Sequence, residues 1–69
     1  MRNDIFLKEV GRKIVARRKE LQIHQQELAD LCKISRSGLS YIENGIQSPN
    51  LMMLRNIADK LGVDIKYFL

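Results

Sequence analysis

The sequence has one cysteine, one proline and no tryptophan among its 69 residues. A single cysteine excludes an internal disulfide, which is typical of proteins that work in a reducing compartment. No apolar run approaches the roughly 20 residues that a membrane-spanning helix needs. The N-terminal segment MRNDIFLKEV carries too much charge for a signal peptide. These absences argue against a secreted or membrane-spanning protein and predict a cytoplasmic one.

The patterns that enzymes and metal proteins need are also missing. One histidine, His24, and one cysteine, Cys32, make a poor metal site, because zinc sites use about four such ligands. There is no glycine-rich phosphate loop and no credible Ser-His-Asp set, and the chain is too short to enclose a pocket. We therefore predict no enzyme activity, no metal and no cofactor. The apolar position of Cys32 favours a packed small hydrophobe over a redox-sensing thiol.

Hydrophobic residues and positive charge are present in quantity. The hydrophobic fraction of 45% is enough for one small core and argues against disorder. The net charge of +4 weakly favours an anionic partner, either nucleic acid or a membrane surface. Many of the cations lie in RKIVARRK, residues 12–19, which fits a nucleic-acid-binding arm, a nuclear signal or the solvated face of a helix. The apolar stripe that continues through Ile14 favours the helix face.

Apolar periodicity predicts an all-α chain of five short helices. They should cover residues 4–21, 25–32, 36–43 and 51–61, with a last turn at 65–69. Asn50 and Asp64 are good N-caps for the last two elements. Gly45 and Gly62 are stop signals for the elements that precede them. The stripes that should face the core contain Phe6, Val10, Ile14, Leu28, Ala29, Cys32, Leu39, Ile42, Leu51, Leu54, Ile57, Ala58 and Leu61.

The segment SRSGLSYIENG, residues 35–45, is unusually polar for the centre of so small a protein. A helical wheel at roughly 100° per residue divides it into two faces. The inward face holds Ser35, Gly38, Leu39, Ile42 and Glu43. The outward face holds Arg36, Ser37, Ser40, Tyr41 and Asn44. Serine is a poorer helix former than the Lys and Glu of most solvated faces. The outward face fits an ordinary exposed helix and a helix that meets base edges in the DNA major groove equally well.

The stretch HQQELADLCKISRSGLSYIENGIQSPN, followed by IADKLGV, resembles the helix-turn-helix of the phage-repressor and Cro class, the Xre family. The likeness runs from about Val10 to the final YFL. The combination of QQELA, IS, IENG and SPN is more specific than helix-turn-helix spacing alone. The resemblance implies a compact five-helix lambda-repressor-like domain that binds double-stranded DNA, with the helix-turn-helix at about 25–44. Most members of this family regulate transcription and bind operators as dimers.

The resemblance also implies roles for single residues. Arg36 matches a base-reading position, where a bidentate contact with guanine would give roughly 1–3 kcal/mol of discrimination. Gln25 matches a glutamine that opens the second helix of the family and contacts a DNA phosphate. The implied base-contacting residues are Arg36, Ser37, Ser40 and Tyr41. The implied phosphate-contacting residues are Gln25, Gln26, Ser35, Asn44 and Gln47.

Further positions match structural features of the family. Arg18 and Glu43 match a pair that forms a partly buried salt bridge between the first and third helices. The helical wheel independently puts Glu43 on the inward edge. Phe68 matches a core residue. Five helices cannot bury every apolar residue at the C-terminal end, and the remainder predicts a dimer interface. The residues of this patch are Ile65, Tyr67 and Leu69.

The sequence departs from the family pattern in three places. Gln22 and Lys33 stand where glycine is common, and a left-handed backbone there would cost a non-glycine residue roughly 1 kcal/mol. His24 stands where Ser or Thr commonly caps the second helix, and histidine is a poorer cap. The loop GIQSPN lacks the Lys or Arg that many relatives carry for phosphate contact. This last departure predicts a shallower salt dependence of DNA binding.

These observations support one hypothesis and one alternative. The hypothesis is a single domain, residues 1–69, with no attached sensor domain. It would act as a sequence-specific repressor that binds a palindromic operator as a dimer, in the cytoplasm and at the nucleoid of a bacterium or its phage. A Cro-like repressor, a restriction-system controller and an antitoxin-type autoregulator fit equally. The alternative is a protein-interaction module of antitoxin or bridging-factor type, which would tolerate the loss of Arg36 and Tyr41.

Overall fold

The computed structural model describes residues 3–69, which form four α-helices and one 3-10 helix without any strand. The elements are α1 (Asn3–Glu20), α2 (Gln25–Cys32), α3 (Arg36–Glu43), α4 (Leu51–Lys60) and η1 (Ile65–Phe68). The all-α prediction is confirmed, and the bounds of α2 and α3 coincide with the predicted ones. Among the residues that the structure describes, no helix is both long and apolar enough to cross a membrane.

The last element corrects the prediction of five α-helices, because η1 is a single 3-10 turn. The Tyr67 N–H donates to the Asp64 carbonyl at 2.9 Å, and the Leu69 N–H donates to the Lys66 carbonyl at 3.0 Å. Bonds between residues three apart define this tighter helix, which rarely extends beyond about four residues. Asp64 caps the turn as expected, since its Oδ1 accepts the Lys66 N–H at 2.9 Å.

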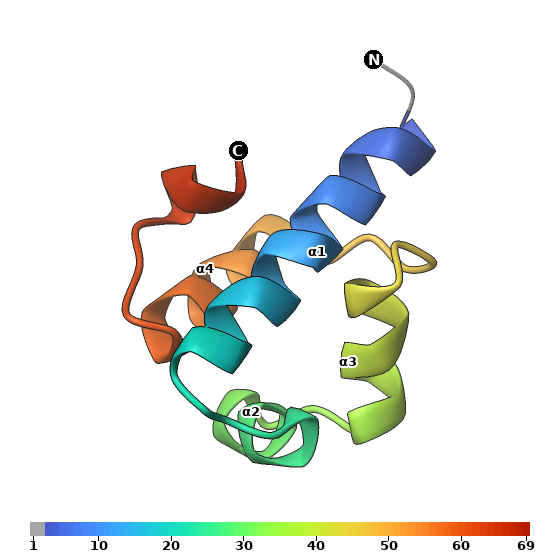
Figure 1. Ribbon diagram of the computed structural model, residues 1–69. Coiled ribbons are helices and arrows are strands. Elements are labelled where there is room, and N and C mark those ends of the chain that lie inside the picture. Colours follow the sequence, from blue (N-terminus) through green and yellow to red (C-terminus); the bar gives the residue numbers. More distant parts are fainter. Residues whose placement is uncertain (1–2) are drawn as a thin grey trace.

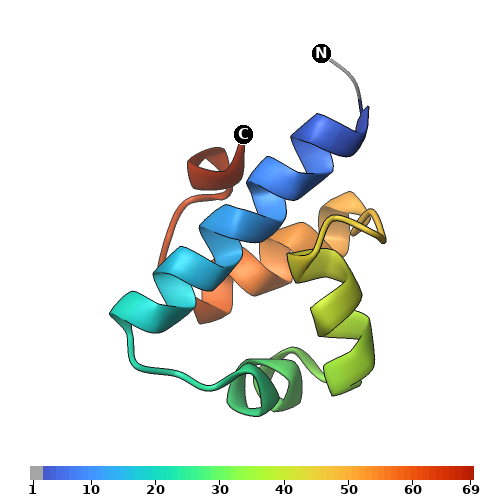
Figure 2. The same ribbon diagram turned by 45° about the vertical axis from the view of Figure 1, so that its right-hand side comes forward.

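The helices pack around one core. α1 packs against α3, α2 packs against both α3 and α4, and η1 packs against α1 and α4. Figures 1 and 2 show α2 and α3 meeting as a corner at the end of the molecule opposite η1 and the start of α1. This arrangement leaves one side of α3 without a packed neighbour.

Most of the predicted core is buried, including Ile14, Leu39, Ile57 and Phe68. Two predicted core residues are not: Phe6 is 37% exposed and Leu51 is 69% exposed. The first turns of α1 extend beyond the other helices (Figures 1 and 2), and the start of its apolar stripe is only partly covered. Leu51 is the first residue of α4, where the chain enters from an exposed loop. Periodicity predicts a face but not how far along the helix the face is covered.

The two positions where the family commonly has glycine both need a left-handed backbone. Gln22 has φ of 57° and Lys33 has φ of 59°. Lys33 ends α2, and the turn that it makes lets the Ile34 N–H donate to the Ala29 carbonyl at 3.0 Å. Hydrogen bonds of this kind satisfy the last carbonyls of a helix and offset a backbone cost of roughly 1 kcal/mol per residue.

Candidate nucleic-acid interface

α3 presents a polar outer face because its apolar side chains are packed into the core. The Oγ of Ser35 accepts the Gly38 N–H at 2.9 Å and so begins the helix. Leu39 and Ile42 are buried in the core. Of the predicted base-contacting residues, Arg36, Ser37 and Tyr41 are exposed and Ser40 is half-buried. The outer face therefore offers one cation, hydroxyls and an aromatic ring, and the helix's acid, Glu43, is buried.

An ion pair joins α1 to the end of α3. The Arg18 Nε lies 3.0 Å from the Oε2 of Glu43, and its second terminal nitrogen lies 3.3 Å from Oε1. Arg18 also donates to the Ile23 carbonyl at 3.0 Å. The side chains of Arg18 and Glu43 are only 13% and 4% exposed. The residues of the predicted salt bridge are therefore in contact, and the pair fixes the C-terminal end of α3 against α1.

Gln25 extends this ion pair toward the outer face of α3. Its Nε2 donates to Oε1 of Glu43 at 2.8 Å, and its Oε1 accepts from Nε of Arg36 at 3.1 Å. Both polar groups of the side chain thus have partners within the protein. Arg18, Glu43, Gln25 and Arg36 form one continuous chain of hydrogen bonds, which we name the arginine relay.

The other predicted phosphate-contacting residues lie around α3, but several also serve the fold. The Nε2 of Gln26 donates to the Oδ1 of Asp30 at 2.9 Å, within α2. The Nδ2 of Asn44 donates to the Ser40 carbonyl at 2.8 Å. Gln47 is exposed in the loop after α3. Side chains that also hold local structure would meet a phosphate in a fixed orientation.

The start of α2 lacks the usual Ser or Thr cap, and the structure supplies another group there. His24 occupies the N-cap position. The carboxylate of Glu27 accepts the His24 backbone N–H at 3.0 Å. Glu27 thereby provides the reciprocal half of a capping box and places negative charge where the helix dipole favours it.

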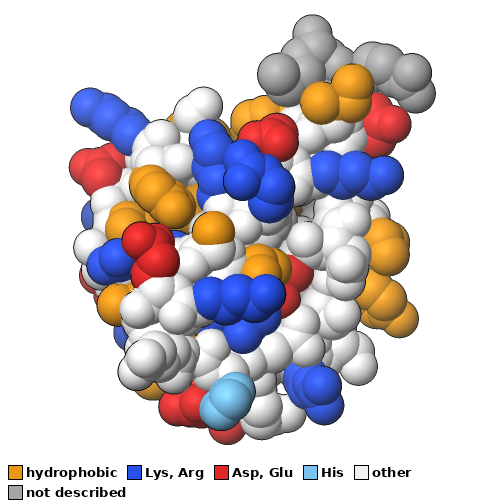
Figure 3. Space-filling view, in the orientation of Figure 1, with side chains coloured by type: hydrophobic (Ala, Val, Ile, Leu, Met, Phe, Trp, Pro, Cys, Tyr) orange, Lys and Arg blue, Asp and Glu red, His pale blue; other side chains and the backbone are white. Residues whose placement is uncertain are grey.

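The basic run 12–19 lies within α1, and several of its cations have partners in the protein. Arg12 pairs with Glu9 at 2.9 Å, and this contact lowers the pKa of the Glu9 carboxyl. The Nε of Arg17 donates to the Leu61 carbonyl at 3.0 Å. Figure 3 shows Lys and Arg side chains along the face over α1, with acidic side chains among them. The run is a helix face with Ile14 buried beneath it, as predicted.

Gly11 positions α3 and was not singled out from the sequence. It is buried in α1, and a Cβ at this position would lie 2.2 Å from the carbonyl oxygen of Glu43. Only a glycine lets α1 approach the end of α3 so closely. An isolated glycine inside a helical pattern is itself a signal of such a packing constraint, because it costs roughly 1 kcal/mol relative to alanine.

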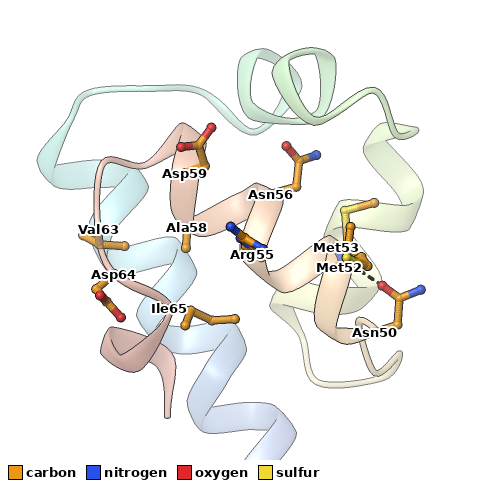
Figure 4. A pocket seen from close by; sticks show the side chains of 10 residues that line it. All are labelled: Asn50, Met52, Met53, Arg55, Asn56, Ala58, Asp59, Val63, Asp64 and Ile65. Carbon is orange, nitrogen blue, oxygen red and sulfur yellow. Dashed lines mark hydrogen bonds between the residues drawn. The ribbon is translucent and has the colours of Figure 1, made fainter.

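A groove lies on a different part of the surface, on α4 and the segment that follows it (Figure 4). Its lining includes Met52, Arg55, Asp59 and Ile65, and none of the predicted DNA-contacting residues. Of the predicted dimer residues, Ile65 is half-buried in this lining, while Tyr67 and Leu69 are 38% and 65% exposed.

Nothing in residues 3–69 forms a cluster of His, Cys, Asp or Glu side chains able to hold a metal ion. Cys32 is buried among apolar side chains, and this burial raises the pKa of its thiol. A raised pKa lowers the thiolate fraction and hence the reactivity of the sulfur. The position agrees with the interpretation of Cys32 as a packed small hydrophobe.

Comparisons with known proteins agree with this architecture. Residues 14–68 match the model of the HTH_3 helix-turn-helix family. The chain is 39% identical over 56 residues to the immunity repressor protein of Bacillus phage phi105. The match covers 81% of this chain and 39% of that repressor, so the chain spans less than half of the length of this relative.

Solved structures share the fold. The restriction-modification controller protein C.AhdI from Aeromonas hydrophila superposes with a TM-score of 0.87 at 22% identity, over 91% of this chain and 96% of that chain. An HTH_3 family transcriptional regulator from Vibrio cholerae superposes with a TM-score of 0.88 at 25% identity, over 97% of this chain and 38% of that chain. The clp gene regulator ClgR from Corynebacterium glutamicum gives a TM-score of 0.88 at 21% identity, over 91% of this chain and 67% of that chain.

Proposed function

The chain belongs to the HTH_3 helix-turn-helix family, and from this premise we propose that it binds double-stranded DNA sequence-specifically and regulates transcription. The finer proposal is a repressor that occupies a palindromic operator as a dimer in the cytoplasm. Similarity to a phage immunity repressor supports repression rather than activation. The observation that carries the proposal is the outer face of α3.

The outer face of α3 is held rigidly by the core and carries side chains that can bind DNA bases. Leu39 and Ile42 anchor α3 in the core, and the buried carboxylate of Glu43 holds its far end. Arg36 and Ser37, exposed at its first turn, can meet acceptors on base edges, and the Tyr41 ring can contact a thymine methyl group or a phosphate. A helix whose outer face has no exposed acid meets no repulsion from the phosphates on either side of the groove.

Contacts to phosphates would flank this helix. We propose Gln26, Asn44 and Gln47 as side-chain contacts and the start of α2 as the source of backbone N–H groups. Ser35 and Gln25 complete the predicted set, although their side chains already have protein partners. Lys33, which forms no ion pair with any described residue, and the helix face of α1 add long-range attraction.

The dimer would form at the C-terminal segment. The ring of Tyr67 packs edge-to-face against the buried ring of Phe68, with centroids 5.2 Å apart. We propose that the exposed Tyr67 and Leu69 and the half-buried Ile65 supply the apolar contacts of the dimer. A two-fold pair built there would place two α3 helices on half-sites about 34 Å apart.

Selection of bound duplexes from a random DNA pool at near-physiological salt tests the proposal. We expect a palindromic consensus with half-sites about one helical turn apart. A pool without any consensus, with only weak and salt-sensitive binding, would contradict it. That result would favour the protein-interaction alternative, with the groove on α4 and the C-terminal apolar residues as the surface to test.

A further inference from the structure

We propose that Lys8, on α1, binds a phosphate of the DNA backbone beside the C-terminal end of α3. This inference rests on the proposed DNA-binding function and deepens it. It adds a cation from outside the helix-turn-helix to the predicted phosphate-contacting residues. The assignment comes from the packing of α1 against the loop that follows α3, residues 45–50, which we name the GIQSPN loop after its sequence.

α1 contacts the GIQSPN loop at Lys8. Gly45 opens this loop with φ of 71°, and a Cβ on Gly45 would lie 2.6 Å from the Cγ of Lys8 and 2.9 Å from its Cα. One turn further along α1, Gly11 lies against the carbonyl oxygen of Glu43. Two adjacent turns of α1 are thus packed against the end of α3 and the start of the loop. The side chain of Lys8 therefore begins at a fixed point beside the loop.

The ammonium group of Lys8 is free to bind an anion. Lys8 is exposed and forms no ion pair with any residue that the structure describes. Two acids of the adjoining segments have other partners, since Glu9 pairs with Arg12 and Glu43 is buried against Arg18. The charge of Lys8 is therefore not bound to a carboxylate within the described part of the chain.

The GIQSPN loop offers exposed polar side chains, Gln47 and Ser48, but no cation of its own. In a helix-turn-helix the N-terminal residues of the second helix contact base edges. The opposite end of α3 and the loop after it then lead out of the groove toward the DNA backbone. Lysine binds phosphate as a flexible point charge. Lys8 supplies from α1 the cation that the loop lacks.

This contact changes one expectation from the sequence. The absence of Lys and Arg from the GIQSPN loop predicted a shallower salt dependence of DNA binding. Each cation that neutralises a phosphate contributes about 0.9 to the slope of log affinity against log salt. A contact from Lys8 restores this contribution through a different element. Because phosphates carry no sequence information, the contact adds affinity equally for all duplexes.

The variant Lys8→Gln tests the contact, since glutamine is a good helix former and removes only the charge. The matched control is Lys60→Gln, which removes the same charge from an exposed lysine at the end of α4. Figures 1 and 2 show this end of α4 apart from α3. Lys8→Arg is the conservative variant that keeps the charge. Affinity for the selected duplex is measured by fluorescence anisotropy over a series of salt concentrations.

We expect Lys8→Gln to lower the magnitude of the salt slope by about 0.9 for each bound copy of the protein. The loss of affinity should be the same for the consensus duplex and for duplexes altered at single base pairs. Lys60→Gln and Lys8→Arg should keep the slope of the wild type. A slope that Lys8→Gln leaves unchanged, or that both charge-removing variants change equally, would overturn the proposal.

Duplexes in which one phosphate is replaced by an uncharged methylphosphonate locate the contact. The wild type should lose affinity when the phosphate bound by Lys8 is neutralised, and Lys8→Gln should lose nothing further at that position. At the other phosphates the two proteins should respond alike. Equal sensitivity of both proteins at every phosphate would refute a direct contact.

Failure of the proposed function gives a different result from failure of this inference. A wild type without any sequence preference would refute base reading, while a slope difference between wild type and Lys8→Gln on random-sequence duplexes would still support the phosphate contact. A sequence-specific wild type whose salt slope does not respond to Lys8→Gln would refute the contact alone. Equal melting temperatures of the wild type and Lys8→Gln, expected for an exposed side chain, verify that the variant is folded.

Discussion

Replacement of Gly11 by alanine tests the closest contact between α1 and α3. A Cβ on residue 11 would lie 2.2 Å from the carbonyl oxygen of Glu43 and 2.7 Å from that of Ile42. Both oxygens belong to the backbone, so no side-chain rotation can relieve the overlap. A carbon and a carbonyl oxygen in contact are normally about 3.3 Å or more apart. The two helices would have to separate by about 1 Å at this point.

The expected cost follows from two opposing effects. Overpacking of a well-packed interior typically costs about 1–3 kcal/mol, while alanine gains about 1 kcal/mol over glycine in a helix interior. The overlap involves backbone, and the separation would also stretch the buried pair between Arg18 and Glu43. We therefore expect the clash to exceed the usual range and a net loss of about 2 kcal/mol. For a domain of this size the melting temperature should fall by roughly 8–16 °C.

Gly38→Ala is the matched control, because Gly38 also lies inside a helix. The nearest atom to a Cβ there is the Oγ of Ser35 at 3.1 Å, a side-chain atom that also caps the helix and would have to shift only slightly. We expect a much smaller change in melting temperature than for Gly11→Ala, because the gain of alanine over glycine in a helix opposes any loss at the cap. Thermal and urea unfolding followed by circular dichroism at the helix band would measure both variants. A Gly11→Ala protein that melts within about 2 °C of the wild type would refute the close approach of α1 to α3.

Three further predictions concern the buried pair and the DNA interface. Arg18→Ala leaves the carboxylate of Glu43 buried without a cation and should destabilise the fold by about 3–5 kcal/mol in thermal unfolding; equal melting temperatures would contradict this. Arg36→Ala with Ser37→Ala should erase operator preference, to which Arg36 contributes about 1–3 kcal/mol, and leave weak nonspecific binding; full preference in binding assays would refute the placement of the base-reading helix. Gln47→Lys should steepen the slope of log affinity against log salt by about 0.9 through one new phosphate contact, and an unchanged slope would place this loop away from DNA.

The sequence predicted the elements well where the signals are local. Caps and stop residues lie within a turn of the helix ends that they define, which is why the bounds of α2 and α3 were predicted without error. The Asn50 cap was predicted on the same basis, and its Oδ1 accepts the Met53 N–H at 2.8 Å. The errors occurred where coverage by other helices decides the outcome, as at Phe6 and Leu51. Periodicity also could not predict that η1 is a single 3-10 turn, because four residues are too few to show a repeat.

The sequence by itself determined the family, the order of the helices and which face of α3 is polar, because these follow from residue types at short spacings. Apart from the pair of Arg18 and Glu43, which the family resemblance implied, the tertiary structure alone decided which polar side chains bond to one another across helices. Gln25 meets Glu43 and Arg36 across 18 and 11 residues of sequence, and Gly11 meets the end of α3 across more than 30. Contacts between segments so far apart depend on how whole helices pack, so no local pattern records them. That packing is what makes a buried ion pair and an exposed arginine parts of one hydrogen-bonded relay.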